Sequence, residues 1–228
     1  MKKRNTILCY ISIFFLSGTT CLAQFRNSGF LVRDSFSRRQ SELITEFGNN
    51  KKIENSIELE CLTALSFFPE LKNTTITFKF GKPISTMVSR PDIRSLVKRQ
   101  SEREYVIIIR LPNTSKTGLE WTMLNFSALV GWIGHELSHI CKYREKTNTG
   151  ILVMGISYIF PANRMKIEKE TDINTIRHGL GQALYDGTYF TLQQPKVSIR
   201  YKRKLQKYYL EPEEILREIG YTETTVTR

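Results

Sequence analysis

A five-residue stretch in the middle of the chain, His135-Glu136-Leu137-Ser138-His139, restricts the fold more than any other feature. In an α-helix, side chains four residues apart lie one above the other on the same face. His135 and His139 can therefore bind one zinc ion from a single helix, and Glu136 would reach a water beside that ion. The chain has only three histidines, and two of them fall in this motif. The fold must then pack this helix against a second segment that completes the site.

Zinc in a hydrolytic site usually takes three protein ligands and one water, so a third ligand must come from elsewhere. Downstream, Glu168 and Asp172 are four residues apart and share one face of a predicted helix. We expect Glu168 to be the third ligand and Asp172 to accept the N–H of a ligating imidazole. Glu170, about 200° around the helix from Glu168, is the weaker alternative. Thr175 and Gly179 continue the stripe, and a glycine there suggests close packing on the histidine helix.

The two motifs together resemble those of the gluzincin metallopeptidases, a clan that includes thermolysin-like enzymes and some integral-membrane peptidases. The resemblance covers roughly residues 120–185. It implies a zincin-like fold with one zinc ion per chain, held by His135, His139 and Glu168. It also implies that Glu136 is the general base that takes a proton from the water at the zinc.

The function that this resemblance implies is a zinc-dependent endopeptidase acting on a peptide or protein substrate. Zincins commonly present a strand edge beside the cleft, where an extended peptide adds as another strand. That edge would come from residues 75–80, 86–90 or 105–110. A donor for the tetrahedral oxyanion is also needed, and His178 is a candidate; Tyr185 and Tyr189 are the others.

Three other interpretations stay open. The domain can be a catalytically silent zincin-like module that binds or supports a partner, although a purely structural site needs no base at Glu136. It can hydrolyse a non-peptide amide, such as a cell-wall component. Finally, His135 and His139 can lie on an ordinary core helix that binds no metal.

The N-terminal segment has the pattern of a secretory signal peptide. Residues 2–4 are basic, residues 7–16 are apolar, and a small residue, Ala23, precedes the expected cleavage point. We therefore expect residues 1–23 to be removed and the protein to be exported to the periplasm or the extracellular space. Lipoprotein anchoring at Cys21 is disfavoured because the preceding residues 18–20 lack the expected aliphatic residue. No later stretch is long and apolar enough to span a bilayer.

The chain is strongly basic, with a formal net charge of +12. The expected signal segment holds three basic and no acidic residues, so residues 24–228 carry +9. Such a charge suits weak contact with an anionic surface, whereas export argues against nucleic acid as a partner. The densest basic cluster is interpreted as a solvated helix face; it comprises Arg200, Lys202, Arg203, Lys204 and Lys207. Cleavage leaves Cys61 and Cys141, which either pair or remain two buried thiols.

Residues 24–228 are long enough for one domain with a sizeable core. Alternating or continuously apolar runs predict strands at 75–80, 86–90 and 105–109. Helical patterns are predicted at 39–47, 57–68, 119–143, 151–160 (short and buried), 161–185, 197–209 and 212–219. Strands come first and helices follow, which predicts an α+β fold: a small antiparallel or mixed sheet and then a mainly helical half. Residues 24–54 are polar and are predicted to form a loosely packed N-terminal segment.

Overall fold

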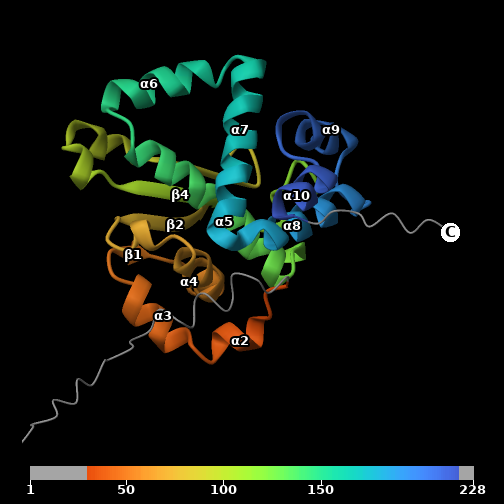
Figure 1. The fold of residues 1–228 in the computed structure, drawn as a ribbon, viewed down its shortest axis with the longest axis horizontal. Coiled ribbons are helices and arrows are strands. Elements are labelled where there is room, and N and C mark those ends of the chain that lie inside the picture. The colour runs from red at the N-terminus through yellow and green to blue at the C-terminus, as the bar shows by residue number, and fades with distance from the viewer. Residues whose placement is uncertain (1–29, 221–228) are drawn as a thin grey trace, which may run out of the picture.

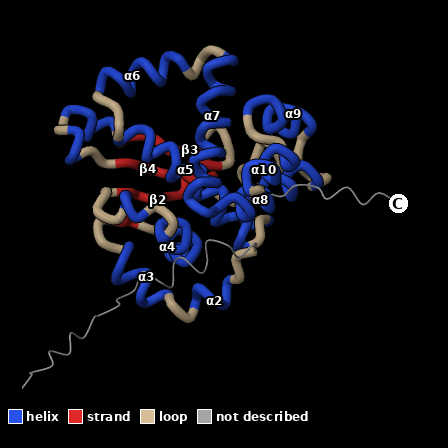
Figure 2. Tube along the Cα trace, viewed as in Figure 1, coloured by secondary structure: helices blue, strands red, loops and turns tan. Residues whose placement is uncertain are grey.

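The computed structural model describes residues 30–220, so the expected signal peptide at 1–23 lies outside the described residues. The α+β class is confirmed, because the described chain is mainly helical around one mixed sheet (Figure 2). Its helices and strands are α2 (Arg33–Ser37), α3 (Gln40–Phe47), β1 (Lys51–Lys52), α4 (Glu58–Ser66), β2 (Ile76–Gly81), β3 (Met87–Pro91), β4 (Tyr105–Arg110), α5 (Phe126–Arg144), α6 (Asn148–Ser157), α7 (Pro161–Thr175), α8 (Gly181–Gln193), α9 (Ile199–Tyr208) and α10 (Pro212–Ile219).

The sheet has four strands in the order β1-β2-β4-β3. Strands β1, β2 and β4 run parallel, and β3 pairs antiparallel with β4, with Ser89 opposite Ile107. The continuously apolar β4 lies inside the sheet, as its β-branched composition predicts, and Ile107 and Ile109 are fully buried. Strand β3 has a neighbour on one side only, so it forms an edge of the sheet.

Helix α5, which carries the H-E-x-x-H motif, lies at the centre of the molecule and contacts α4, α7, α8 and β3 (Figure 1). Its first residue is Phe126, because the side chain of Asn125 caps the helix by accepting the backbone N–H of Ala128 at 2.8 Å. The predicted start near residue 119 is therefore wrong. Two glycines allow the close packing: a Cβ at Gly131 would meet backbone atoms of Ala183 on α8, and a Cβ at Gly134 would meet the side chain of Leu180, just before α8.

The prediction of one helix from Pro161 to Tyr185 is also wrong. Helix α7 ends at Thr175, a π-helical turn follows at Ile176–Leu180, and α8 begins at Gly181. Gly179 has a φ of 88° inside this turn, a conformation that L side chains rarely adopt. The glycine is therefore required by the bend in the chain, while the stripe before it packs on α5 as predicted.

Helix α6 forms where residues 151–160 predict a helix, but it is not buried. None of its residues is buried, and Leu152, Val153 and Ile156 are each more than half exposed. Hydropathy correctly predicts an apolar segment here, whereas the prediction that other elements cover it is wrong.

The described part of the N-terminal segment is well packed, contrary to the prediction for residues 24–54. Leu31, Phe36, Leu43 and Phe47 are buried and belong to the main hydrophobic core, which extends along the chain as far as Leu205. Residues 24–29 lie outside the described residues.

Cys61 and Cys141 are free thiols, so they do not form the disulfide that the sequence left open. Cys61 is buried in the core, and burial raises the pKa of its thiol well above the usual value. Cys141 donates a hydrogen bond to the Glu70 carboxylate at 3.2 Å, on the side of α5 that faces away from the motif histidines. In residues 30–220, none of the helices has the length and apolar character required to cross a membrane.

Candidate metal centre

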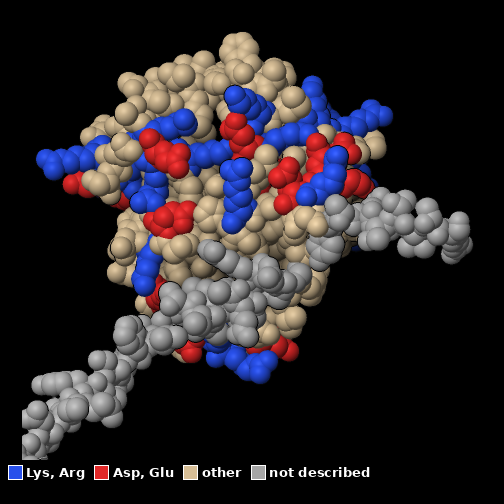
Figure 3. Space-filling view, in the orientation of Figure 1, with Lys and Arg blue, Asp and Glu red and all other residues tan. Residues whose placement is uncertain are grey.

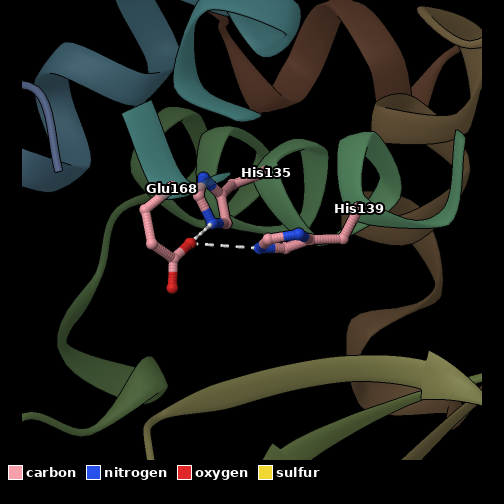
Figure 4. A group of neighbouring side chains, drawn as sticks. All are labelled: His135, His139 and Glu168. Atoms are coloured by element: carbon pink, nitrogen blue, oxygen red, sulfur yellow. Dashed lines mark hydrogen bonds and ion pairs between the residues drawn. The ribbon is translucent and has the colours of Figure 1, made fainter. Parts of the chain in front are cut away.

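The structure brings His135, His139 and Glu168 together (Figure 4). The Nε2 atoms of His135 and His139 lie 3.2 and 3.1 Å from the same carboxylate oxygen, Oε2 of Glu168. All three side chains are buried, and Glu168 is only 1% exposed. Within residues 30–220 this is the one group of His, Cys, Asp or Glu side chains whose ligand atoms converge closely enough to hold a metal ion.

The distances from Glu168 to the two imidazoles fit a tetrahedral site. Nitrogen and oxygen ligands lie about 2.0–2.1 Å from zinc, which places neighbouring ligand atoms of a tetrahedron about 3.3 Å apart. The distances of 3.1 and 3.2 Å from Glu168 to the two imidazoles match that value. The group can therefore hold a divalent ion with little rearrangement, and three protein ligands leave one position for water or substrate.

Helix α7 supplies the third ligand through the predicted stripe. Its buried residues are Glu168, Thr171, Asp172 and Thr175, which follow the i, i+3, i+4, i+7 spacing of one helical face. Ser138 of α5 and Thr175 share a hydrogen bond of 2.9 Å between their hydroxyl groups, which fixes the register of the two helices beside the site. A buried polar seam of this kind holds the glutamate opposite the histidines.

Each histidine is oriented through its other ring nitrogen. Nδ1 of His135 lies 2.7 Å from Oδ1 of Asp172, whose second oxygen accepts the backbone N–H of Leu210 at 2.8 Å. Nδ1 of His139 lies 3.4 Å from the hydroxyl of Thr171. Because carboxylate and hydroxyl oxygens accept here, each ring presents a proton on Nδ1 to its outer partner, which leaves Nε2 of each ring facing Glu168, where a metal ion would bind it. Asp172 thus occupies the orienting position expected from the sequence.

The second oxygen of Glu168 is held by two tyrosines that the sequence did not indicate. The phenol of Tyr158 donates to Oε1 of Glu168, and the phenol of Tyr209 donates to the same atom at 3.1 Å. Burial and the nearby charge of Glu168 raise the pKa of Tyr209 well above its usual value, so its phenol stays a donor. Neither tyrosine stands at a motif spacing from Glu168; only the tertiary fold brings them together.

The electrostatics of the group favour a cation between its members. Burial is the largest influence on the pKa of Glu168 and would raise it, but hydrogen bonds and charge from His135 and His139 together hold that pKa well below its usual range. Burial alone would lower the pKa of His135, whereas Asp172 and Glu168 raise it well above the usual value. A buried carboxylate that stays ionised beside two imidazoles is a suitable ligand for a divalent ion.

Glu136 lines the adjoining cleft, which has a volume of about 330 Å³. Across residues 30–220, no group hydrogen-bonds to its carboxylate. The edge strand β3 forms one wall of the cleft, and Met154, Gly155 and Tyr158 form another. Trp132 lines a small extension of the cleft beside Glu136, so this residue borders the site.

The remaining sequence candidates lie elsewhere. His178 stacks on Phe68 with ring centroids 4.2 Å apart, and its Nε2 lies 2.8 Å from a carboxylate oxygen of Glu70. The structure does not bring it to the cluster, so His178 is not retained as an oxyanion donor. Tyr185 and Tyr189 stack on each other on α8, and neither lines the cleft.

Glu170, the alternative third ligand, is also excluded by its position. It is exposed and faces the ammonium group of Lys142, at 3.5 Å. This is the opposite side of α7 from Glu168, as the angle between the two residues predicts.

Comparison of the chain with family models, with curated proteins and with solved structures returned no match. The inference about function therefore depends on the geometry of the site alone.

Proposed function

We propose that this protein is an exported zinc-dependent endopeptidase of zincin type. The observation that carries the proposal is the convergence of His135, His139 and Glu168, with Glu136 beside them at the floor of an open cleft. A purely structural metal site is usually closed by four protein ligands and needs no carboxylate base next to it. Here three ligands leave a position that faces the cleft.

Zinc is the ion that suits this donor set best. Two imidazoles and one carboxylate, with hydrogen-bonded outer partners, are a ligand set of hydrolytic zinc sites. When bound, zinc supplies Lewis-acid polarisation of a carbonyl group and lowers the pKa of a water to about 7. Peptide binding, proton transfer and oxyanion stabilisation are assigned to residues of the chain.

Strand β3 is the proposed binding edge for an extended peptide. Its Thr86 carbonyl accepts the N–H of Arg110 and its Asp92 N–H donates to Glu104, so the alternate residues of β3 bond to β4. The backbone groups of Met87 and Ser89 therefore face away from β4. Their carbonyl groups accept hydrogen bonds from the hydroxyls of Ser85 and Tyr143, which an added peptide would replace. A peptide that adds there as an antiparallel strand lies along the cleft wall, beside Glu136.

Glu136 is the proposed general base. Its carboxylate is next to the metal ligands yet free to accept a proton from a water in the cleft and to pass it to the leaving amine. Tyr209 is the proposed donor to the oxyanion, because its phenol lines the cleft and its ring lies 5.5 Å from that of His135. Its single proton bonds to Glu168 in the structure, so this role requires the hydroxyl to turn from Glu168 to the oxyanion. Tyr158 keeps Glu168 in place from the other side.

The direct test is the variant Glu136→Gln, assayed against a broad mixture of peptides. It should keep its zinc and its fold and lose about 10²–10⁴-fold in hydrolysis rate, the usual effect of removing a general base. Glu170→Gln is the matched control, because Glu170 is an exposed glutamate on α7 that contacts only Lys142, and it should stay active. Unchanged hydrolysis in Glu136→Gln would refute the mechanism.

The same assay separates the other functions that the sequence leaves open. A wild-type protein that binds zinc but cleaves no peptide would favour a silent binding module, whereas cleavage of a cell-wall amide alone would favour the non-peptide hydrolase. Export is tested separately, by sequencing the N-terminus of the protein recovered from outside the cytoplasm; the proposal predicts that it begins at Gln24.

A further inference from the structure

Helix α6 presents an apolar surface to solvent. Leu152, Val153 and Ile156 lie on it, and Ile159 and Phe160 follow in the turn to α7; each of the five is more than half exposed. Large exposed apolar patches on a water-soluble protein usually mark an interaction site. The stretch from Thr147 to Asn163 contains no charged residue at all.

The sequence on both sides of this stretch is basic. The five residues before it and the five after it include Lys142, Arg144, Lys146, Arg164 and Lys166, against Glu145 and the buried Glu168. Figure 3 shows the surface over α6, at the top of the view, as uncharged, with Lys and Arg side chains below and beside it, interspersed with Asp and Glu.

Two neighbouring segments extend this rim. Asn148, at the start of α6, donates to the backbone of Leu96, which ties α6 to a segment where Ile93 and Val97 are exposed. Arg94 and Lys98 lie in the same segment and pair with Asp92 and Glu104. On the other side, the guanidinium of Arg164 lies 4.6 Å from the ring centroid of Tyr208, which joins α7 to the basic helix α9. Helices α6 and α9 lie towards the same end of the molecule (Figure 1).

We propose that α6 and the turn after it dock on the surface of an anionic phospholipid bilayer, with the apolar side chains among the lipid chains and the basic rim at the headgroups. Interfacial segments combine these two features: an apolar face for the hydrocarbon boundary and Lys or Arg for anionic lipid. Helix α6 lies across the end of the molecule and does not span the membrane (Figure 1).

A second copy of the chain is a less suitable occupant. A two-fold contact through α6 would place the same patch of both copies together, and with it two basic rims of the same sign. A bilayer with anionic headgroups can accommodate both the apolar patch and the basic side chains beside it.

The position of α6 also indicates a class of substrate, and this inference rests on the proposed peptidase function. The outer side of the helix carries the apolar patch, and its inner side, through Ile151, Met154 and Gly155, lines the cleft beside the metal centre. Docking therefore places the cleft next to the bilayer. The substrate class that follows is a peptide segment held at a membrane surface.

The test is flotation with lipid vesicles, using phosphatidylcholine alone and phosphatidylcholine mixed with phosphatidylglycerol. All proteins begin at Gln24, because the apolar residues 7–16 would bind lipid themselves and the described fold begins after them. Circular dichroism and zinc content establish that each protein is folded. The wild type should float with the anionic vesicles, much less with phosphatidylcholine alone, and less as salt is added.

The triple variant Val153→Ser, Ile156→Ser and Ile159→Ser removes apolar area at exposed positions, where the fold does not depend on it. It should lose at least tenfold in partition to anionic vesicles while it keeps zinc. The matched control is Ile84→Ser, because Ile84 is 98% exposed but lies away from α6, and it should float like the wild type.

Three results would overturn the proposal: no flotation of the wild type, equal flotation of the triple variant, or a stable dimer through α6 that leaves no lipid binding. Zinc binding and peptide hydrolysis in solution are measured on the same proteins, so a failure of docking is distinct from a failure of the proposed enzyme.

Discussion

Replacing Asp172 by asparagine leaves one acceptor for two donors at the back of the metal centre. In the wild type, Oδ1 accepts from Nδ1 of His135 at 2.7 Å, and Oδ2 accepts the backbone N–H of Leu210 at 2.8 Å. The asparagine amide nitrogen cannot accept a hydrogen bond, so either the imidazole or the backbone N–H loses its partner. Asp172 is only 2% exposed, so water does not readily replace it.

The expected loss in zinc affinity follows from the orientation of His135. Removing the outer partner of a ligating histidine typically costs about 10–100-fold in metal affinity, or about 1.4–2.7 kcal/mol. The unpaired buried donor should also lower the free energy of unfolding of the metal-free protein by about 1–3 kcal/mol. Both effects come from one substitution that changes the volume of the side chain very little.

The assay is competition for zinc with a chromophoric chelator, together with urea unfolding of the metal-free protein. The control is Asp186→Asn. Asp186 is a partly buried carboxylate on α8 that accepts hydrogen bonds from Ser127 of α5 and Gln182 of α8. The control should change the free energy of unfolding but not the zinc affinity. A folded Asp172→Asn protein with wild-type zinc affinity would refute the role given to this carboxylate.

Three further predictions follow from single contacts. Tyr209→Phe should keep zinc and lose about 10²–10³-fold in kcat, the effect of removing one oxyanion donor; an unchanged kcat would assign this phenol only to holding Glu168. Gly131→Ala should lower the free energy of unfolding in urea by about 1–3 kcal/mol because its Cβ would meet the backbone of α8, whereas Gly155→Ala on α6, with open space around it, should raise it by about 0.5–1 kcal/mol. Burial would raise the pKa of Glu70, but hydrogen bonds from its own backbone N–H, Cys141 and His178 lower that pKa overall. The ionised form of Glu70 therefore stabilises the fold at neutral pH, and this stabilisation is lost as pH falls. The destabilisation by Glu70→Gln should accordingly shrink through the acid range, which urea unfolding at neutral and acidic pH measures.

Local spacing was sufficient to predict which side chains share a face at the candidate metal centre. The i, i+4 pairs His135 with His139 and Glu168 with Asp172 require only that each segment is helical, because the helix then fixes which side chains share a face. Strands β2, β3 and β4 and the last two helices were predicted for the same reason, since their apolar patterns are local, whereas the two-residue strand β1 was not predicted. The match between the predicted and observed bounds of α10, Pro212–Ile219, reflects its proline start and glycine end.

Features that depend on tertiary contacts were not predictable from the sequence. Tyr158 and Tyr209 meet Glu168 from two different segments, at no recurring spacing. The break at Gly179 is hidden in a helical pattern, because a single glycine does not reveal its φ angle. The apolar composition of α6 could not tell whether other elements cover it, and the structure leaves it exposed.

Zinc stoichiometry tests the central claim most directly. Wild-type protein and the variants His139→Ala and Glu168→Ala are dialysed against trace zinc, and bound metal is counted by elemental analysis alongside circular dichroism. One zinc ion per wild-type chain, lost in both folded variants, is the result that the geometry of His135, His139 and Glu168 predicts. A folded wild type without bound zinc, or full zinc in Glu168→Ala, would contradict it.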